Sequence, residues 1–428
     1  MATQQRSDVD LVPAAAHAHR QARRADRLAR SAALALLRRL RHGELAIVED
    51  GRRHVVGSVD AHCPLRATIT VHAPAFWRAL LSGGSRALGV AYVDGAWDTD
   101  DAVALTRIAS CNLGRVDALQ DALAPALLPL QRTLRWFDRN TRARSVQRIR
   151  RHYDLGNDFF ALMLDPTMTY SCGLYTHAEA TLHEAQVAKL DRACRWLRLA
   201  PDDHVLEIGT GWGGFAVHAA RNHGCRVTTT TLSREQHRVA VRRVAEAGLE
   251  DRVTVLLQDW RELRGSYDKL VSIEMIEAVG PQFLGAFLAA CSRLLTGDGL
   301  MFLQAIVSSH RMYRTGRYAH SFISDVVFPG SCLPSVTAIT DAVGTRTDMR
   351  LLALEDITPG YPRTLMAWRA GVDGNEERVR ALGYDERFLR LWRLYLDYCA
   401  GAFLERRIGD VQMLLAKPAF REATPLGC

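Results

Sequence analysis

The sequence has no apolar run long enough to cross a bilayer. Its nearest candidate, Ser-Ala-Ala-Leu-Ala-Leu-Leu at residues 31–37, is short and lies inside an arginine-rich segment. No cleavage-type sequence accompanies it, so we reject a secretory signal peptide. We therefore expect a cytoplasmic protein.

The sequence also lacks paired cysteines. It has nine cysteines, an odd number, and they are scattered without any Cys-x-x-Cys pair. This distribution argues against a disulfide framework and against a structural zinc site. We expect a reducing compartment and no bound metal.

Length and charge set the remaining bounds. A chain of 428 residues, 48% hydrophobic and 24% charged, is long enough for two globular domains. The net charge of +8 comes mostly from arginine, concentrated at residues 20–41 and 132–151. Such patches suit either nucleic acid or an anionic membrane surface. The sequence shows no Asn-Pro-Pro-Tyr-like block and no basic stretch interleaved with aromatic residues, which disfavours nucleic acid.

The first 141 residues predict a small α+β domain. Residues 16–42 have helical spacing, with an apolar stripe of Leu28, Ala32, Leu36 and Leu40 that we expect to pack on the domain rather than lie on a membrane. Short strands follow within residues 43–71, and a helix at 102–134. Apolar periodicity stops near Arg142 in a basic connector, so we predict domains at 1–141 and 142–428.

The second part is organised around one short stretch, residues 204–215. An apolar strand at 205–208 runs into Gly209, Gly211 and Gly213, and then into a helix at 214–222. Glycines allow the backbone to approach a ligand closely, and the helix presents free N–H groups to it. The stretch predicts a ligand-binding turn.

Strands and helices alternate after this point. We predict a helix at 186–199 and strands at 205–208, 225–231, 253–258, 267–273 and 300–306. Alternation of this kind indicates a doubly wound parallel sheet, in which ligands lie beyond the carboxyl ends of the strands.

Residues 207–214, Glu-Ile-Gly-Thr-Gly-Trp-Gly-Gly, resemble the S-adenosylmethionine-binding turn of class I methyltransferases. The Gly-Trp-Gly-Gly ending is typical of one branch, the cyclopropane-fatty-acyl-phospholipid synthases. Blocks at 152–160, 168–175, 231–236, 272–280, 328–335 and 361–368 are similar to that family in the same order. Residues 89–97 resemble a block of its longer, two-domain members, and we interpret that block as a packed turn without chemistry. The resemblance implies a Rossmann-like class I methyltransferase sheet.

The resemblance implies a set of residues around S-adenosylmethionine. No carboxylate ends the second predicted strand, at residues 229–233, where methyltransferases usually place the ribose ligand, and the family pattern assigns that role to Gln236. The full expected set is Tyr170, Ser171, Glu207, Gly209, Gly211, Gly213, Thr231, Leu232, Gln236, Asp259 and Trp260.

The resemblance also implies a bicarbonate ion beside the reacting carbons. Cys172, Glu277, Ile306 and Tyr361 match the residues that hold the ion, while Gln304 stands where the family has histidine. An amide donates a hydrogen bond but takes no proton. A carboxylate such as Glu277, bracketed by apolar residues, needs a partner when buried. We interpret Cys172 as an ion ligand and not as a nucleophile.

The expected reaction transfers the methyl carbon of S-adenosylmethionine to the double bond of an unsaturated acyl chain in a phospholipid. Bound bicarbonate then removes a proton, and a cyclopropane forms. The aromatic rings of Tyr175, Phe160 and Phe328 are candidates to stabilise the intermediate cation. A methylene or methyl branch is the alternative product, and a nucleic-acid methyltransferase or a non-catalytic lipid-binding protein are more distant alternatives. The resemblance further implies a homodimer. The arginine-rich patches, with a substrate that resides in the membrane, predict peripheral association with the inner membrane surface.

Overall fold

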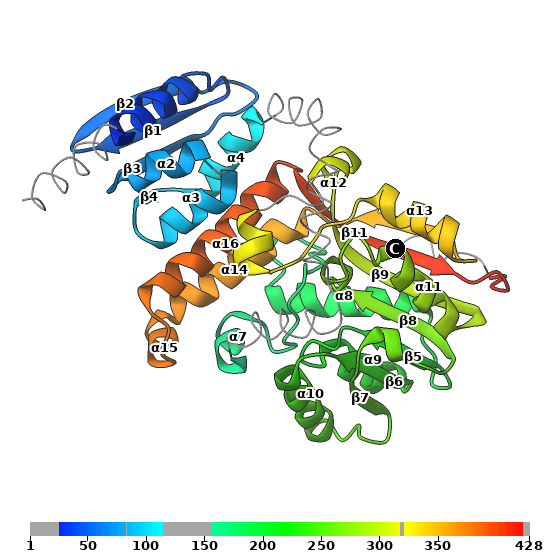
Figure 1. The fold of residues 1–428 in the computed structure, drawn as a ribbon. Helices are drawn as coiled ribbons and strands as arrows, with labels where there is room; N and C mark the ends of the chain where they lie inside the picture. Colours follow the sequence, from blue (N-terminus) through cyan, green and yellow to red (C-terminus); the bar gives the residue numbers. More distant parts are fainter. Residues whose placement is uncertain (1–24, 83, 114–155, 317–320, 423–428) are drawn as a thin grey trace, which may run out of the picture. The chain divides into compact units, whose positions relative to one another are not determined.

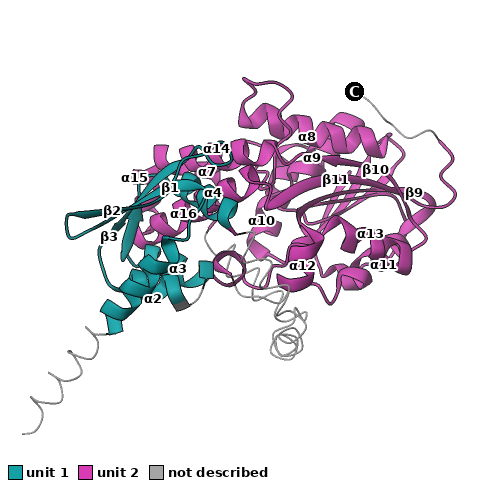
Figure 2. Cartoon of the chain, turned by 90° about the horizontal axis from the view of Figure 1, so that it is seen from above, with its two compact units in different colours: residues 1–112 teal, residues 113–428 magenta. Residues whose placement is uncertain are grey.

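The computed structural model describes residues 25–82, 84–113, 156–316 and 321–422. Contacts divide the chain into two compact units, residues 1–112 and 113–428, coloured separately in Figure 2. The predicted boundary at 141/142 lies outside the described residues and remains a prediction.

The first unit is α+β, as the sequence predicts. Its elements are a helix at 25–37, β1 (Gly43–Glu49), β2 (Arg52–Ser58), β3 (Arg66–Val71), α2 (Ala75–Ser82), α3 (Gly84–Val93), β4 (Trp97–Thr99) and α4 (Ala102–Asn112). The strand order is β2-β1-β3-β4, with β1 and β3 parallel and the outer pairings antiparallel. Of the predicted helix 102–134, the part beyond Leu113 lies outside the described residues.

One detail of this unit differs from prediction, and another agrees with it. The helix at 25–37 packs through Ala33 and Leu34, whereas Leu28 and Leu36 of the predicted stripe are 72% and 49% exposed. Arginines occur on more than one face of this helix, so the sequence pattern did not identify which face packs on the sheet. Residues 89–97 form the end of α3 and a turn into β4, and the buried Trp97 indole donates to the Leu88 carbonyl at 3.0 Å.

The second unit contains a seven-stranded sheet in the order β10-β11-β9-β8-β5-β6-β7 (Figure 1). Its strands are β5 (His204–Ile208), β6 (Arg226–Thr231), β7 (Val253–Leu257), β8 (Tyr267–Ile273), β9 (Leu295–Ser308), β10 (Arg350–Asp356) and β11 (Ile408–Ala416). The pairings from β7 through β9 are parallel, whereas β11 is antiparallel to both β9 and β10. The five predicted strands are present, and the prediction missed β10 and β11.

Helices cover both faces of this sheet. One face packs against α8 (Leu182–Leu197), α9 (Gly214–His223) and α10 (Arg234–Glu246), and the other against α11 (Leu284–Leu294) and α13 (Val336–Arg346) (Figure 2). The sheet is therefore doubly wound. Helix α8 begins four residues before the predicted start because Thr181 and Glu184 form a capping box.

Further helices complete the unit: α7 (Asn157–Met163), α12 (His310–Gly316), α14 (Gly360–Gly374), α15 (Glu376–Ala381) and α16 (Glu386–Leu404). Single turns lie at Trp260–Glu262 and Ile276–Ala278, and a π-helical turn at Ile323–Val327. Within the described ranges, no helix is both long and apolar enough to span a membrane.

Candidate active site

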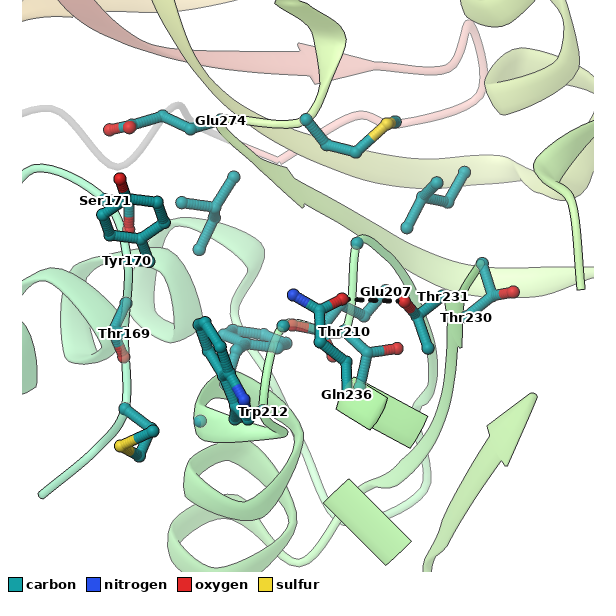
Figure 3. A pocket seen from close by; sticks show the side chains of 18 of the residues that line it. Thr169, Tyr170, Ser171, Glu207, Thr210, Trp212, Thr230, Thr231, Gln236 and Glu274 are labelled. Atoms are coloured by element: carbon teal, nitrogen blue, oxygen red, sulfur yellow. Dashed lines mark hydrogen bonds between the residues drawn. The ribbon is translucent and has the colours of Figure 1, made fainter. Parts of the chain in front are cut away.

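A cavity of about 190 Å³ opens at the carboxyl ends of β5, β6 and β8 (Figure 3). The sheet order runs from β5 to β6 on one side and from β5 to β8 on the other, so the cavity lies where the direction of winding changes. This is the position at which doubly wound sheets bind ligands.

The glycine turn forms the floor of the cavity. Gly209, Gly211 and Gly213 have φ of 111°, 51° and 86°, which L-residues rarely adopt. A Cβ on Gly211 would meet no protein atom within 4 Å, because the space beside it is the cavity. A Cβ on Gly214 would lie 2.7 Å from the Thr167 carbonyl oxygen, so a side chain there would force the start of α9 away.

Nine of the eleven predicted cofactor residues line this cavity: Tyr170, Ser171, Glu207, Gly209, Gly211, Thr231, Leu232, Gln236 and Trp260. The other two do not. Gly213 faces Ala240 of α10, and the buried Asp259 carboxylate is held by the Arg261 guanidinium at 2.7 and 2.8 Å. The neighbouring Gln258 lines the cavity in its place.

The side chain of Gln236 is oriented towards the cavity by hydrogen bonds. Its Oε1 accepts from the Thr231 hydroxyl at 2.9 Å, which turns the amide nitrogen towards the cavity (Figure 3). Ser233 caps α10 by accepting from the Gln236 backbone N–H at 3.2 Å, so the helix start fixes this residue. The arrangement suits a ligand that offers hydroxyl groups.

The titratable side chains of the cavity wall are acidic. Among the described residues that line it, the charged side chains are Glu207 and Glu274, and both are acids. Burial raises the pKa of Glu207 to about 8, although the Thr229 hydroxyl, 2.5 Å from its Oε2, opposes this shift. Such a wall favours a cationic ligand, which stabilises the ionised carboxylates.

Glu274 joins this cavity to a second cluster of polar residues. Its Oε1 accepts from the Cys172 backbone N–H and from Gln304 Nε2, both at 2.8 Å. Its Oε2 accepts from the Tyr361 hydroxyl at 2.5 Å. Glu274 therefore gathers three of the predicted catalytic positions around one carboxylate.

The orientation of the Gln304 amide is fixed by residues of the neighbouring strand β11. Its Oε1 accepts from Gln412 Nε2 at 2.9 Å, so its own Nε2 faces Glu274 and the Asp410 carboxyl, 3.0 Å away. Pairing of β11 with β9 aligns Gln412 with Gln304 and Asp410 with Ile306. Gln304 is thus a donor in a rigid network.

The other two predicted positions pair with each other. Glu277 Oε1 accepts from the Ile306 backbone N–H at 2.6 Å. Burial, reinforced by the charge of Glu274, raises the pKa of Glu277 to about 8 and that of Asp410 well above its usual range. Glu277 Oε2 and Asp410 Oδ1 are buried and accept no hydrogen bond from the described residues. A neutral carboxyl at both places is consistent with that isolation.

Cys172 is a neutral thiol. Burial, followed by the nearby Asp410 and Glu274 carboxyls, raises its pKa well above the usual range, and its Sγ donates weakly to the Gly173 and Ile357 carbonyls. A buried thiol of this kind is a poor nucleophile, in agreement with the sequence interpretation.

Aromatic rings surround this part of the unit. The Tyr170 ring lines the cavity and packs on Trp368 at 4.9 Å, and its hydroxyl bonds the Tyr395 hydroxyl at 2.9 Å. Of the rings proposed from sequence, Phe160 is fully buried and the Arg363 guanidinium covers Tyr175 at 3.9 Å. Phe328 packs on Tyr170 at 6.4 Å. Tyr170 therefore faces the cavity more directly than those three do.

The residues present do not fit bicarbonate as the family pattern predicts. Donors at Cys172, Gln304 and Tyr361 bond the Glu274 carboxylate, and the Ile306 N–H bonds Glu277. A second anion would have to displace a carboxylate of the protein itself.

Sequence reasoning missed Glu274 and Asp410. Glu274 lies inside the 272–280 block, directly after an apolar strand, and an acid at that point signals the ligand edge of a parallel sheet. Asp410 is an acid within the largely apolar run 408–416. Because a buried carboxyl needs a hydrogen-bond partner, its position there predicts one.

Comparison with known proteins gives a consistent result. Residues 140–413 match the family model of mycolic acid cyclopropane synthetase. The chain is 38% identical over 389 residues to tuberculostearic acid methyltransferase UfaA1 of Mycobacterium tuberculosis, covering 88% of this chain and 89% of that protein. It is 35% identical over 354 residues to the cyclopropane-fatty-acyl-phospholipid synthase of Escherichia coli, covering 82% and 88%.

The crystal structure of mycolic acid cyclopropane synthase CmaA1 with SAH and CTAB superposes with a TM-score of 0.60 at 32% identity, covering 64% of this chain and 98% of that one. Fold, cofactor turn and sequence agree over most of the chain. The protein therefore belongs to the cyclopropane-fatty-acyl-phospholipid synthase family of S-adenosylmethionine-dependent methyltransferases.

Proposed function

We propose that this enzyme transfers the methyl carbon of S-adenosylmethionine to the double bond of an unsaturated acyl chain in a membrane phospholipid. The observation that carries the proposal is the junction at Glu274, where an acid-lined cofactor cavity meets a buried proton-handling cluster. Transfer to a hydroxyl or amine also releases a proton, but that proton leaves oxygen or nitrogen and can pass directly to water. Transfer to an alkene needs a positioned base, because the resulting cation must lose a proton from carbon in a site that excludes water.

The chemistry assigns roles to both parts. An isolated alkene is a weak nucleophile, so the cavity must hold the sulfonium methyl in line with it and exclude water. The methyl carbon bonds one alkene carbon as its bond to sulfur breaks, and a cation forms on the neighbouring carbon. The Tyr170 ring at the cavity wall supports that charge. Loss of a proton from the transferred carbon, with its electron pair closing a third carbon–carbon bond, gives a cyclopropane.

A methylene branch is a second candidate product, and Gln304 favours it. The amide takes no proton and is locked by Gln412, Glu274 and Asp410, which sets how the cation meets its base. If a hydride first shifts from the methylated carbon to the neighbouring cation, the cation moves to the methylated carbon. Loss of a proton from the transferred carbon then gives a methylene double bond instead of a ring. A relative named tuberculostearic acid methyltransferase and one named cyclopropane synthase share similar identity with this chain, so both products are consistent with the comparisons.

Labelled substrates will test the function. Purified protein, oleoyl phospholipid vesicles and cofactor with a trideuterated methyl group should give a lipid that retains two deuterons. In a parallel reaction with unlabelled cofactor, whose transferred carbon still carries protons, proton NMR distinguishes ring methylene protons far upfield from methylene protons in the olefinic region. Oligonucleotides in a parallel reaction should stay unlabelled. Labelled oligonucleotide with unlabelled lipid would contradict the proposal.

The membrane surface is part of this proposal. The described part of the first arginine-rich segment carries exposed Arg38, Arg39 and Arg41 beside the exposed Leu36. Basic residues next to an exposed leucine suit the surface of an anionic bilayer. Residues 20–24 and 132–151, which hold the rest of the charge, lie outside the described residues.

Cofactor binding should depend on pH through Glu207. Its carboxyl is neutral below its pKa of about 8 in the empty cavity, and a cationic ligand favours the ionised form. Affinity for S-adenosylmethionine should therefore rise with pH towards 8, by at most about tenfold per unit. Calorimetry at pH 7 in buffers of different ionisation enthalpy should detect proton release on binding.

The matched control is Glu207→Gln, which keeps the shape of the side chain and removes its proton. The cofactor's own amino group titrates equally with both proteins, so the difference in released protons isolates Glu207. Equal proton release from the two proteins would exclude Glu207 as the titrating group.

A further inference from the structure

Glu274 adopts a backbone conformation that its side chain does not favour. It lies immediately after β8 with φ of 47°, in the left-handed region where glycine is the usual residue. A non-glycine residue there is strained and persists where the surroundings compensate. The compensation is the set of three hydrogen bonds to its carboxylate.

Those three donors form an anion-binding site. A backbone N–H from Cys172, an amide from Gln304 and a hydroxyl from Tyr361 converge on one carboxylate from a loop, strand β9 and helix α14. They are the positions at which the family resemblance expects bicarbonate. In this protein the Glu274 side chain fills that seat.

The charge around the seat leaves no place for a further anion. Glu277 and Asp410 are buried carboxyls beside it, and the charge of Glu274 contributes to keeping both of them neutral. The cation buried near them is Lys189, whose Nζ donates to Ser171 Oγ and Gln186 Oε1, both at 2.5 Å. Adding bicarbonate to a site that already holds Glu274 would place two anions against one lysine.

Glu274 is also the member of this cluster that lines the cavity. It lines the cavity, and Figure 3 shows its carboxylate on the side of Tyr170 and Ser171. Cys172, Glu277, Gln304 and Tyr361 are not among the residues that line it. A proton leaving the transferred carbon would meet the Glu274 carboxylate first.

We propose that Glu274 is the proton acceptor of the reaction and that this enzyme works without bicarbonate. The inference rests on the proposed function. The carboxylate takes a proton from the transferred carbon, and the electron pair of that C–H bond becomes the new carbon–carbon bond. Neutral Glu274 returns the proton to solvent before the next turnover. Tyr361, Gln304 and the Cys172 N–H position the carboxylate and are not themselves proton acceptors.

The test replaces Glu274 by glycine, which suits φ of 47° and empties the seat while leaving its donors. Full-length wild-type protein and Glu274→Gly are assayed with oleoyl phospholipid vesicles in carbon dioxide-free buffer, with and without added bicarbonate. Wild-type turnover should change less than about twofold, and the variant should lose about 100-fold or more. Added bicarbonate should restore much of the variant's activity. Glu274→Gln, which keeps the seat filled by an amide, should stay inactive in both buffers.

Binding provides a readout independent of turnover. The resonance of ¹³C-labelled bicarbonate should broaden with Glu274→Gly and not with wild type. Glu250 is an exposed acid after α10, and the Glu250→Gln variant serves as the control: it should leave the bicarbonate resonance as the wild type does. Wild-type turnover that requires bicarbonate, or Glu274→Gln that remains active, would overturn the inference. Absence of lipid product from the wild type in either buffer would instead contradict the proposed function.

Discussion

Replacing Gly211 by valine should weaken S-adenosylmethionine binding at least about 100-fold, equivalent to about 2.7 kcal/mol. Gly211 has φ of 51°, and a side chain there would project into the cavity, since no protein atom lies within 4 Å of its Cβ position. The valine would therefore occupy the space that the ligand needs. Isothermal calorimetry measures the loss directly.

Gly248 offers a matched control. It has φ of 64°, its Cβ position is equally open, and it lies in the turn after α10, outside the residues that line the cavity. Gly248→Val should carry the same backbone penalty of about 1–2 kcal/mol and leave binding intact. If a folded Gly211→Val protein binds the cofactor as wild type does, the glycine turn is not the cofactor site.

Replacing Lys189 by methionine should destabilise the fold by about 3–5 kcal/mol. Lys189 is fully buried in α8, and burial lowers its pKa to about 8 against the opposing charges of Glu274 and other groups. Methionine keeps the length of the side chain but removes the cation near Glu274. It also leaves Ser171 Oγ and Gln186 Oε1 without this donor. Urea unfolding at pH 7 measures the loss.

Lys269→Met is the comparison. The Lys269 ammonium lies 4.0 Å from Asp203, at the limit of an ion pair, so its removal should cost less than that of Lys189. Similar unfolding midpoints for the two variants would mean that the buried charge cluster does not depend on Lys189.

The parts predicted well from sequence are those with local causes. Gly209 and Gly211 follow an apolar strand, and this combination predicts a turn that only glycine can make. Helix α9 and strands β5 to β8 follow from period and spacing alone. The cavity forms at the predicted edge because parallel strands bring distant turns together there.

The parts predicted poorly depend on distant partners. Asp410 and Gln412 interrupt the apolar pattern of β11, and their burial is explained by a partner, Gln304, that lies over a hundred residues away in the sequence. The same interruption hid the strand itself. The left-handed conformation of Glu274 is set by its contacts and leaves no trace in local spacing.

The family resemblance predicted the positions of the site residues but not the group that they bind. It predicted that positions 172, 304 and 361 would converge, and they do. The identity of the group at their centre depends on residue 274, which the family pattern did not single out. Residues that match a family pattern predict which donors converge more reliably than they predict which group those donors bind.

Completion of the site depends on strand β11, which is synthesised late in the chain. The walls of the cofactor cavity are made by residues 168–278, whereas Asp410 and Gln412 emerge from the ribosome more than 130 residues later. A nascent chain can thus assemble the cofactor seat well before Gln304 acquires the neighbours that orient it. Until β11 pairs with β9, Gln304 lacks the Asp410 and Gln412 side chains that orient its amide. The network around Glu274 is therefore complete only when the last strand of the sheet is in place.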